Sequence, residues 1–331
     1  MRIPAEIHLT LLMNIKAKKK LLWAILFSIG FTGFLLLKVD WVHFHSIADK
    51  LNIKVLIIAY CVYLLSNLVR TFRFYKLDHI NQKLAHWWYI SAFYNFITAT
   101  LPGGSGEAST AYILKRFSKY NILGALRILL ISRLMDLFAL SALFFMTALM
   151  MNSNTSYREA AVWLSGTLFI ISSVTLLRSS ERFIMRLFQK VPWHSTLMNR
   201  LSEKLSELIK ISEEQRSNRS FFITLFQSVL MWFGGIILLH LILKSLGIDF
   251  PFIQSAYCFG VYAIFQIVPV QGIAGIGTQA AWWALALSVA GYDAPDKIAL
   301  GFVLHAIYYI FVSLMGLFSM LFWITGTRKR N

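Results

Sequence analysis

Long apolar runs, separated by short polar stretches, dominate the chain. Six of them are long enough to cross a membrane as helices, and they cover residues 21–37, 55–69, 123–149, 161–177, 221–243 and 298–323. About 20 helical residues cross the hydrocarbon core of a bilayer. The pattern therefore predicts an all-α polytopic membrane protein with six confident spans.

Two further apolar runs, 87–101 and 252–268, are each interrupted by proline and glycine and then resume as a second short piece. A helix of 15 residues is only ~22 Å long, which is short of the ~30 Å hydrocarbon core. We therefore expect two re-entrant broken-helix hairpins. A pair of kinked full spans, packed within the bundle, is the alternative reading. Irregular backbone at this depth must be buried in protein or line a wet cavity.

Composition supports a membrane location and changes how the charge is interpreted. The chain has 331 residues, of which 57% are hydrophobic and only 14% are charged, and this excludes a soluble globular protein. Lys and Arg number 32 against 15 Asp and Glu. Because the basic residues lie mainly in loops, we interpret them as determinants of membrane orientation rather than as a nucleic-acid-binding surface.

The distribution of Lys and Arg favours hairpins that return to the face they entered. With that arrangement, 24 basic residues lie on one side, six on the other and two within a span. Cytoplasmic loops are enriched in Lys and Arg. The sequence thus predicts a multi-pass membrane protein with both termini cytoplasmic, including a basic N-terminal segment (1–20) and a basic tail (324–331).

The order of elements repeats along a single transmembrane domain, residues 21–323. Each half, 21–149 and 161–323, contains two spans, a broken hairpin and a further span, and the two halves face opposite ways. Such paired, Gly/Pro-interrupted segments indicate an inverted-repeat transporter with its site near the midplane. Between the halves, residues 178–220 show helical amphipathic spacing. They form either a helix on the inner leaflet or a plain connecting helix.

Four ionisable residues fall where hydrocarbon is expected: Glu107, Arg127, Arg133 and Asp136. Such charges are costly in lipid and normally face a partner or a cavity. Arg127 lies near a helix end and can snorkel, whereas Arg133 lies ~15 Å deep. Asp136 follows Arg133 at i+3, so an ion pair within the helix is expected. Glu107 begins a half-helix, where the helix dipole favours a carboxylate.

These charges have two competing interpretations. They form either a salt-bridge network that locks the hairpin or a site that binds a headgroup or shuttles a proton. The candidate substrate-binding residues combine them with the two breaks and the nearby amides: Pro102, Gly103, Gly104, Ser105, Gly106, Glu107, Arg133, Asp136, Gln266, Pro269, Gly272, Gly275, Gly277 and Gln279.

Several other polar residues are weaker candidates. Those in and after the second hairpin are more often hydrogen-bonded bundle residues than ligands, and they are Tyr262, Gln271, Thr278, His305, Tyr308 and Tyr309. Asp40, His43, His45 and Asp49 are too loosely spaced to indicate a metal site, and we prefer a plain polar loop. The glycine breaks lack the Lys-Ser/Thr and the preceding strand of a P-loop. We predict no cofactor and no catalytic residue.

At its two breaks the chain resembles the transmembrane flippase-like region of lysylphosphatidylglycerol synthases and their stand-alone relatives. The matching stretches are Leu101-Pro102-Gly103-Gly104-Ser105-Gly106-Glu107, Arg133-Leu134-Met135-Asp136-Leu137 and Pro269-Val270-Gln271-Gly272-Ile273-Ala274-Gly275-Ile276-Gly277. The resemblance implies a protein that moves anionic, aminoacylated or polyprenyl-linked lipids between leaflets. The chain departs from the family at Gln279, where an acidic residue is common, and at Thr110, where a basic one is frequent.

The leading hypothesis is therefore an inner-membrane lipid translocase without enzymatic activity, whose partner is a phospholipid or polyprenyl lipid. The chain ends at Asn331 without the soluble aminoacyl-transferring domain, so the resemblance does not imply lipid synthesis. Two alternatives stay open: an integral-membrane transferase or its accessory subunit, and a transporter of a small polar solute or ion. We expect no nucleic-acid partner, and the sequence leaves a homo-oligomer open.

Overall fold

The computed structural model describes residues 49–78, 82–101, 122–151, 156–176, 218–266 and 272–328, with a few single positions between and before them. The predicted first span (21–37), apart from two single positions, and the linker 178–220, apart from its last three residues, lie outside the described residues. The N-terminal segment 1–20 and residues 329–331 of the basic tail also lie outside them.

All regular elements in the described part of the chain are helices. They are α3 (Ile53–Leu77), α4 (Leu84–Thr100), α6 (Ile122–Met150), α7 (Ser156–Leu176), α10 (Asn218–Ser245), α11 (Phe252–Phe265), the 3₁₀ turn η1 (Ile273–Gly275), α12 (Thr278–Val289) and α13 (Lys297–Arg328). The all-α prediction is confirmed for these residues.

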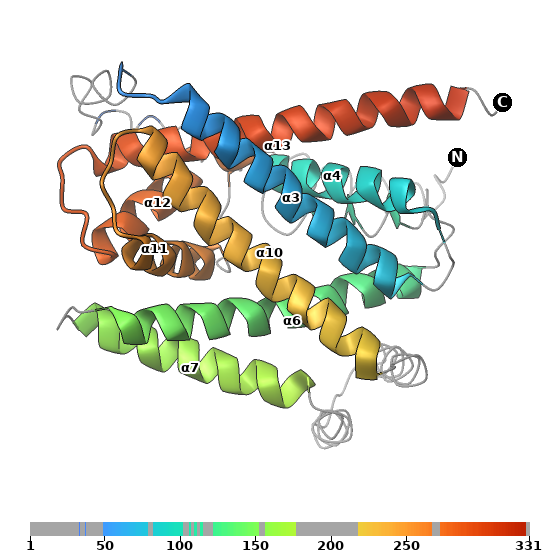
Figure 1. Cartoon of the computed structure of the whole chain (residues 1–331), viewed down its shortest axis with the longest axis horizontal. Helices are drawn as coiled ribbons and strands as arrows, with labels where there is room; N and C mark the ends of the chain where they lie inside the picture. The colour runs from blue at the N-terminus through green and yellow to red at the C-terminus, as the bar shows by residue number, and fades with distance from the viewer. Residues whose placement is uncertain are drawn as a thin grey trace, which may run out of the picture.

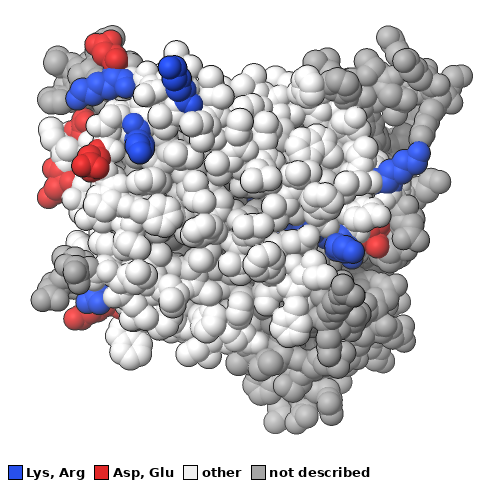
Figure 2. All heavy atoms as spheres, in the orientation of Figure 1, with Lys and Arg blue, Asp and Glu red and all other residues white. Residues whose placement is uncertain are grey.

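Four of the described helices contain a stretch that is long and apolar enough to cross a membrane: Ile53–Leu77, Ile128–Met150, Phe221–Ser245 and Lys297–Ser319. Figure 2 shows the matching surface, on which charged side chains gather towards two opposite edges and leave a broad uncharged band between them. Large apolar side chains such as Trp163 and Ile170 are exposed. This is the surface of a multi-pass membrane protein.

Helix α3 is longer than the apolar pattern predicts. The predicted span ends at residue 69, with Arg70 and Arg73 assigned to a cytoplasmic loop, but the helix continues to Leu77. This assignment was wrong because both arginines turn inward, where Arg73 is buried among neighbouring helices. At the other end, the side chain of Asn52 caps the helix by accepting from the N–H groups of Lys54 and Val55.

The second broken segment consists of two short helices, α11 and α12, that pack against each other. They lie side by side in Figure 1, and at 14 and 12 residues they are about 21 and 18 Å long. The turn before α12 contains Gly275 and Gly277 with φ of 64° and 80°, a backbone region that favours glycine. Helix α12 also packs on α13, where Gly301 lies against the carbonyl oxygen of Ala280.

The first broken segment returns along α4. Gly106 is helical and lies against the backbone of Thr98, so closely that a Cβ at this position would meet the Thr98 Cα atom at 2.7 Å. Further along, Leu114 is buried in a cluster with Trp87 and Ile90 of α4. Residue 106 thus lies close to the end of α4, and residue 114 belongs to a buried cluster that includes residues near its start. Helix α4 also packs against η1, which brings the two broken segments together.

Candidate functional site

A cavity of about 560 Å³ lies in the centre of the bundle. Side chains from α3, α4, α6, α10, α11, α12 and α13 line it, so each of these helices contributes to one shared space. Its wall combines apolar residues, such as Leu238 and Phe259, with polar residues gathered at two places. We call these places the arginine end and the glutamine end.

The arginine end is built around Arg70 on α3. Its guanidinium donates to the amide oxygen of Asn95 and to the sulfur of Met231 and lies 5.6 Å from the centre of the Tyr94 ring. All of these partners are neutral. Within the described part of the chain, the charge of Arg70 therefore has no carboxylate beside it, and the cavity offers an anion a favourable position.

Hydrogen bonds continue from Asn95 to Asn67, which is 2% exposed. The amide nitrogen of Asn95 donates to the Asn67 oxygen at 2.9 Å, and the hydroxyl of Ser91 donates to the same oxygen at 2.9 Å. These contacts join α3 to α4 beneath Arg70. They fix the Arg70 side chain through a chain of amides rather than through an opposite charge.

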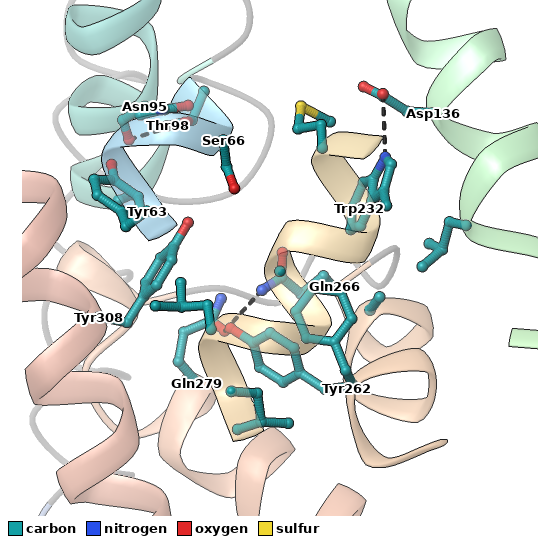
Figure 3. A pocket seen from close by; sticks show the side chains of 18 of the residues that line it. Tyr63, Ser66, Asn95, Thr98, Asp136, Trp232, Tyr262, Gln266, Gln279 and Tyr308 are labelled. Carbon is teal, nitrogen blue, oxygen red and sulfur yellow. Dashed lines mark hydrogen bonds between the residues drawn. The ribbon is translucent and has the colours of Figure 1, made fainter. Parts of the chain in front are cut away.

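A buried ion pair adjoins this end of the cavity. Arg73 on α3 pairs with Asp136 on α6, and the two residues are 2% and 6% exposed. The hydroxyl of Ser228 accepts a hydrogen bond from Arg73 at 2.7 Å. The indole of Trp232 donates to Asp136 at 3.1 Å (Figure 3). The carboxylate is thus matched by both a charge and a neutral donor, as a buried charge requires.

This pairing corrects the expected ion pair between Arg133 and Asp136. Residues at i and i+3 differ by about 60° in direction around a helix, and here the difference separates them. Asp136 points between α3 and α10, whereas Arg133 donates to the hydroxyl of Tyr94 and its guanidinium lies 5.8 Å from the centre of that ring. Arg133 lines the cavity beside Arg70 rather than neutralising the acid below it.

The glutamine end is formed by α11, α12 and α13. The hydroxyl of Tyr262 donates to the side-chain oxygen of Gln279 at 2.6 Å, and the amide of Gln266 lies 3.4 Å from the same atom (Figure 3). The rings of Tyr262 and Trp283 stack at 3.5 Å. His305 contacts the carbonyl oxygen of Ala274 in η1 at 2.9 Å, which fixes the turn before α12 against α13.

The cavity brings together four of the residues predicted from sequence: Arg133, Asp136, Gln266 and Gln279. The glycines of the second break form the turn before α12, where Thr278 accepts from the N–H of Gly272 and donates to the oxygen of Gly275. The described cavity lining does not include these glycines or Gly106. The remaining candidates lie outside the described residues: Pro102, Gly103, Gly104, Ser105, Glu107 and Pro269. The side chain of Arg127 also lies outside them.

Sequence reasoning missed the residues of α3 and α4 that form the arginine end. Asn67 and Arg70 are three residues apart, which places them on one face of a helix, and this spacing would have indicated a polar stripe if the span had been extended past residue 69. Asn95 sits inside an apolar run without a charge to mark it. No group of three His, Cys, Asp or Glu residues that could hold a metal occurs in the described ranges.

A family model, described as the lysylphosphatidylglycerol synthase TM region, matches residues 21–316 of the chain. The chain belongs to this family. The match to the lysylphosphatidylglycerol synthase TM region begins before α3 and reaches into α13, so it includes every helix that lines the cavity. The family connects the chain with membrane proteins of lipid-related processes. No curated protein and no solved structure matches the chain.

Proposed function

We propose that the protein is an inner-membrane lipid translocase, in which the polar headgroup of an anionic or aminoacylated phospholipid, or of a polyprenyl-linked lipid, occupies the central cavity. The observation that carries the proposal is the position of Arg70, a cation with neutral partners among the described residues, in a cavity lined by seven helices of an apolar bundle. The proposed activity is transport and includes no covalent step.

The size and lining of the cavity fit a headgroup better than a whole lipid. A volume of about 560 Å³ is within the range of small-molecule sites, ~300–1,000 Å³. Acyl chains would remain in the bilayer, beside the exposed apolar faces of helices such as α7 and α10. The headgroup would exchange its hydration for Arg70, Arg133 and the amides of the cavity, which lowers the cost of crossing the hydrocarbon.

We propose that the two predicted halves form an inverted repeat with two re-entrant hairpins, an architecture that supports a transport role. In Figure 1, α3 and α10 lie side by side, α4 and α11 lie towards opposite ends, and α6 and α13 run along opposite edges. Each pair occupies corresponding places in the two predicted halves. Movement of one half against the other would open the cavity to either leaflet in turn. We propose that both termini are cytoplasmic.

Reconstitution in liposomes tests the proposal. Acyl-labelled fluorescent phosphatidylglycerol is distributed over both leaflets, and dithionite added outside bleaches only the outer one. Active protein is expected to make inner-leaflet lipid accessible to dithionite. Arg70→Gln should slow this movement by about tenfold or more, because a hydrogen bond to a charged group contributes ~1.5–3 kcal/mol.

The matched control is Lys76→Gln, which removes the same charge from an exposed position near the end of the same helix. Lys76→Gln should move lipid at the wild-type rate. A wild-type protein that transports a trapped soluble anion but leaves the labelled lipid in place would contradict lipid translocation and favour a solute transporter.

A further inference from the structure

Several buried polar atoms of the cavity wall have no hydrogen-bond partner among the described residues, and the side-chain nitrogen of Asn67 is one of them. Asn67 is 2% exposed, lies in the middle of α3 and lines the cavity, yet its amide nitrogen forms no hydrogen bond within the described part of the chain. A buried amide donor without an acceptor costs ~1–3 kcal/mol. Such a group in a cavity indicates the place of a missing acceptor.

The direction of this donor follows from the chemistry of its neighbours. Arg70 can only donate, so the atom of Asn95 that meets it must be the amide oxygen. The nitrogen of Asn95 is then turned to Asn67 and requires the oxygen of Asn67 as its acceptor. The Asn67 nitrogen is therefore the atom left over. Exchanging the oxygen and nitrogen of either amide would set two donors against each other.

From this orientation we infer that Asn67 and Arg70 form a subsite for a phosphate group. The inference deepens the proposed function and rests on it for the source of the phosphate, a lipid headgroup. Asn67 and Arg70 lie one helical turn apart and both line the cavity. The guanidinium supplies charge and further N–H donors, and the Asn67 amide supplies a neutral donor.

Phosphate matches this pair more fully than the other parts of a lipid headgroup. A phosphodiester is ionised at neutral pH and presents oxygens that only accept, whereas a hydroxyl group also brings a donor that would need an acceptor here. Arginine recognises phosphate through paired hydrogen bonds. The only acidic residue in the described lining, Asp136, is paired with Arg73, so it does not cancel the charge of Arg70.

Binding of short-chain lipids to the purified full chain in detergent tests the subsite. The cavity contains Trp232 and Trp283, so tryptophan fluorescence can report occupancy. The probes are dioctanoyl phosphatidylglycerol, glycerol 3-phosphate and dioctanoyl monoglucosyl-diacylglycerol, which has a polar headgroup but no phosphate. We expect the phosphatidylglycerol and glycerol 3-phosphate to bind, and the glucolipid to bind at least about tenfold more weakly.

The sharpest variant is Asn67→Asp, which keeps the shape and the acceptor for Asn95 and Ser91 but replaces the unpartnered donor with a negative oxygen. It should weaken phosphatidylglycerol binding by about tenfold or more. Gln227→Glu is the matched control, because it places the same change on α10 at a residue outside the cavity lining. It should leave binding unchanged.

Two results would overturn the subsite: equal binding of the glucolipid and phosphatidylglycerol by the wild-type chain, or unchanged phosphatidylglycerol binding by folded Asn67→Asp. The first comparison needs no variant, so it remains decisive if Asn67→Asp fails to fold. Phosphate-dependent binding combined with no lipid movement in liposomes would support the subsite and contradict the proposed translocation instead. Lipid movement without selectivity for phosphate would support the proposed translocation and contradict the subsite.

Discussion

Asp136 and Arg73 are buried together, and each carries a charge that the apolar bundle would otherwise exclude. Trp232 and Ser228 each add a neutral hydrogen bond to the pair. The pair joins α3, α6 and α10 next to the arginine end of the cavity. We expect the pair to hold Arg70 and Asn67 in place, so that the charge of Arg70 stays available for the proposed headgroup.

Removal of one partner should therefore cost stability. Asp136→Asn leaves the buried charge of Arg73 uncompensated, and we expect a loss of about 3–5 kcal/mol. The measurement is thermal unfolding of the purified protein in detergent. The double variant Arg73→Gln with Asp136→Asn should recover most of the loss, because it removes both charges.

Asp293→Asn serves as the control for this pair. Its carboxylate pairs with Lys297 on the exposed end of the molecule, where such contacts contribute little, so it should unfold like the wild type. If Asp136→Asn also unfolded like the wild type, the pair would not be a structural element of the bundle.

At the scale of elements, the breaks in the apolar pattern were readable from sequence, and the ends of the helices were not. Proline and glycine mark the two broken segments directly, and α11 and α12 are the two short helices that the second break predicts. The sequence predicts a span that ends before α3 does, because an arginine that follows an apolar run also indicates a loop. Whether an arginine faces water or a buried acid depends on helices distant in sequence, here α6 and α10.

Contacts between helices that are distant in sequence also limit how much of the site can be predicted. Arg133, Asp136, Gln266 and Gln279 could be selected from sequence because polar side chains in apolar runs are conspicuous. Their partners could not, since hydrogen-bond partners are set by packing. Asn67 and Asn95 can be assigned to the site only because hydrogen bonds connect them to Arg70 in the structure.

Close packing of α12 on α13 gives a prediction at the element scale. A Cβ at Gly301 would run into the carbonyl oxygen of Ala280, so Gly301→Val should separate the two helices. We expect a clear fall in the melting temperature and weaker lipid movement, because Gln279 and His305 lie on these helices. Ala306→Val, at an exposed position of α13, is the control and should change neither quantity.

Retention of full stability and transport by Gly301→Val would show that α12 and α13 need not be in backbone contact. A loss of stability in both variants would instead attribute the effect to added bulk on α13.

For the whole molecule, charged residues at the two ends of the uncharged band predict the orientation in the membrane. Lys76 lies at the end of α3 and Asp293 lies in the turn between α12 and α13. In a chain with Cys61 and Cys258 replaced, Lys76→Cys should react with a membrane-impermeant thiol reagent only from the cytoplasmic side. Asp293→Cys should react only from the opposite side.

Lys244→Cys is a second marker for the side of Asp293, because it lies at the end of α10. Reaction of Lys76→Cys and Asp293→Cys from the same side would contradict the proposed arrangement of spans and hairpins.

We propose that a lipid headgroup passes through the cavity between the two halves, and blocking that cavity is a direct test. Ser66 lines the cavity on α3 (Figure 3). The variant Ser66→Cys, in a chain without the native cysteines, is reconstituted in liposomes. Lipid movement is measured before and after alkylation with a bulky maleimide. Mass spectrometry of the protein confirms that the maleimide is incorporated. We expect alkylation to stop lipid movement by Ser66→Cys. The chain that carries only Cys61, which is exposed on α3, should continue to move lipid after the same treatment. Undiminished lipid movement by fully alkylated Ser66→Cys protein would contradict passage of the headgroup through the cavity.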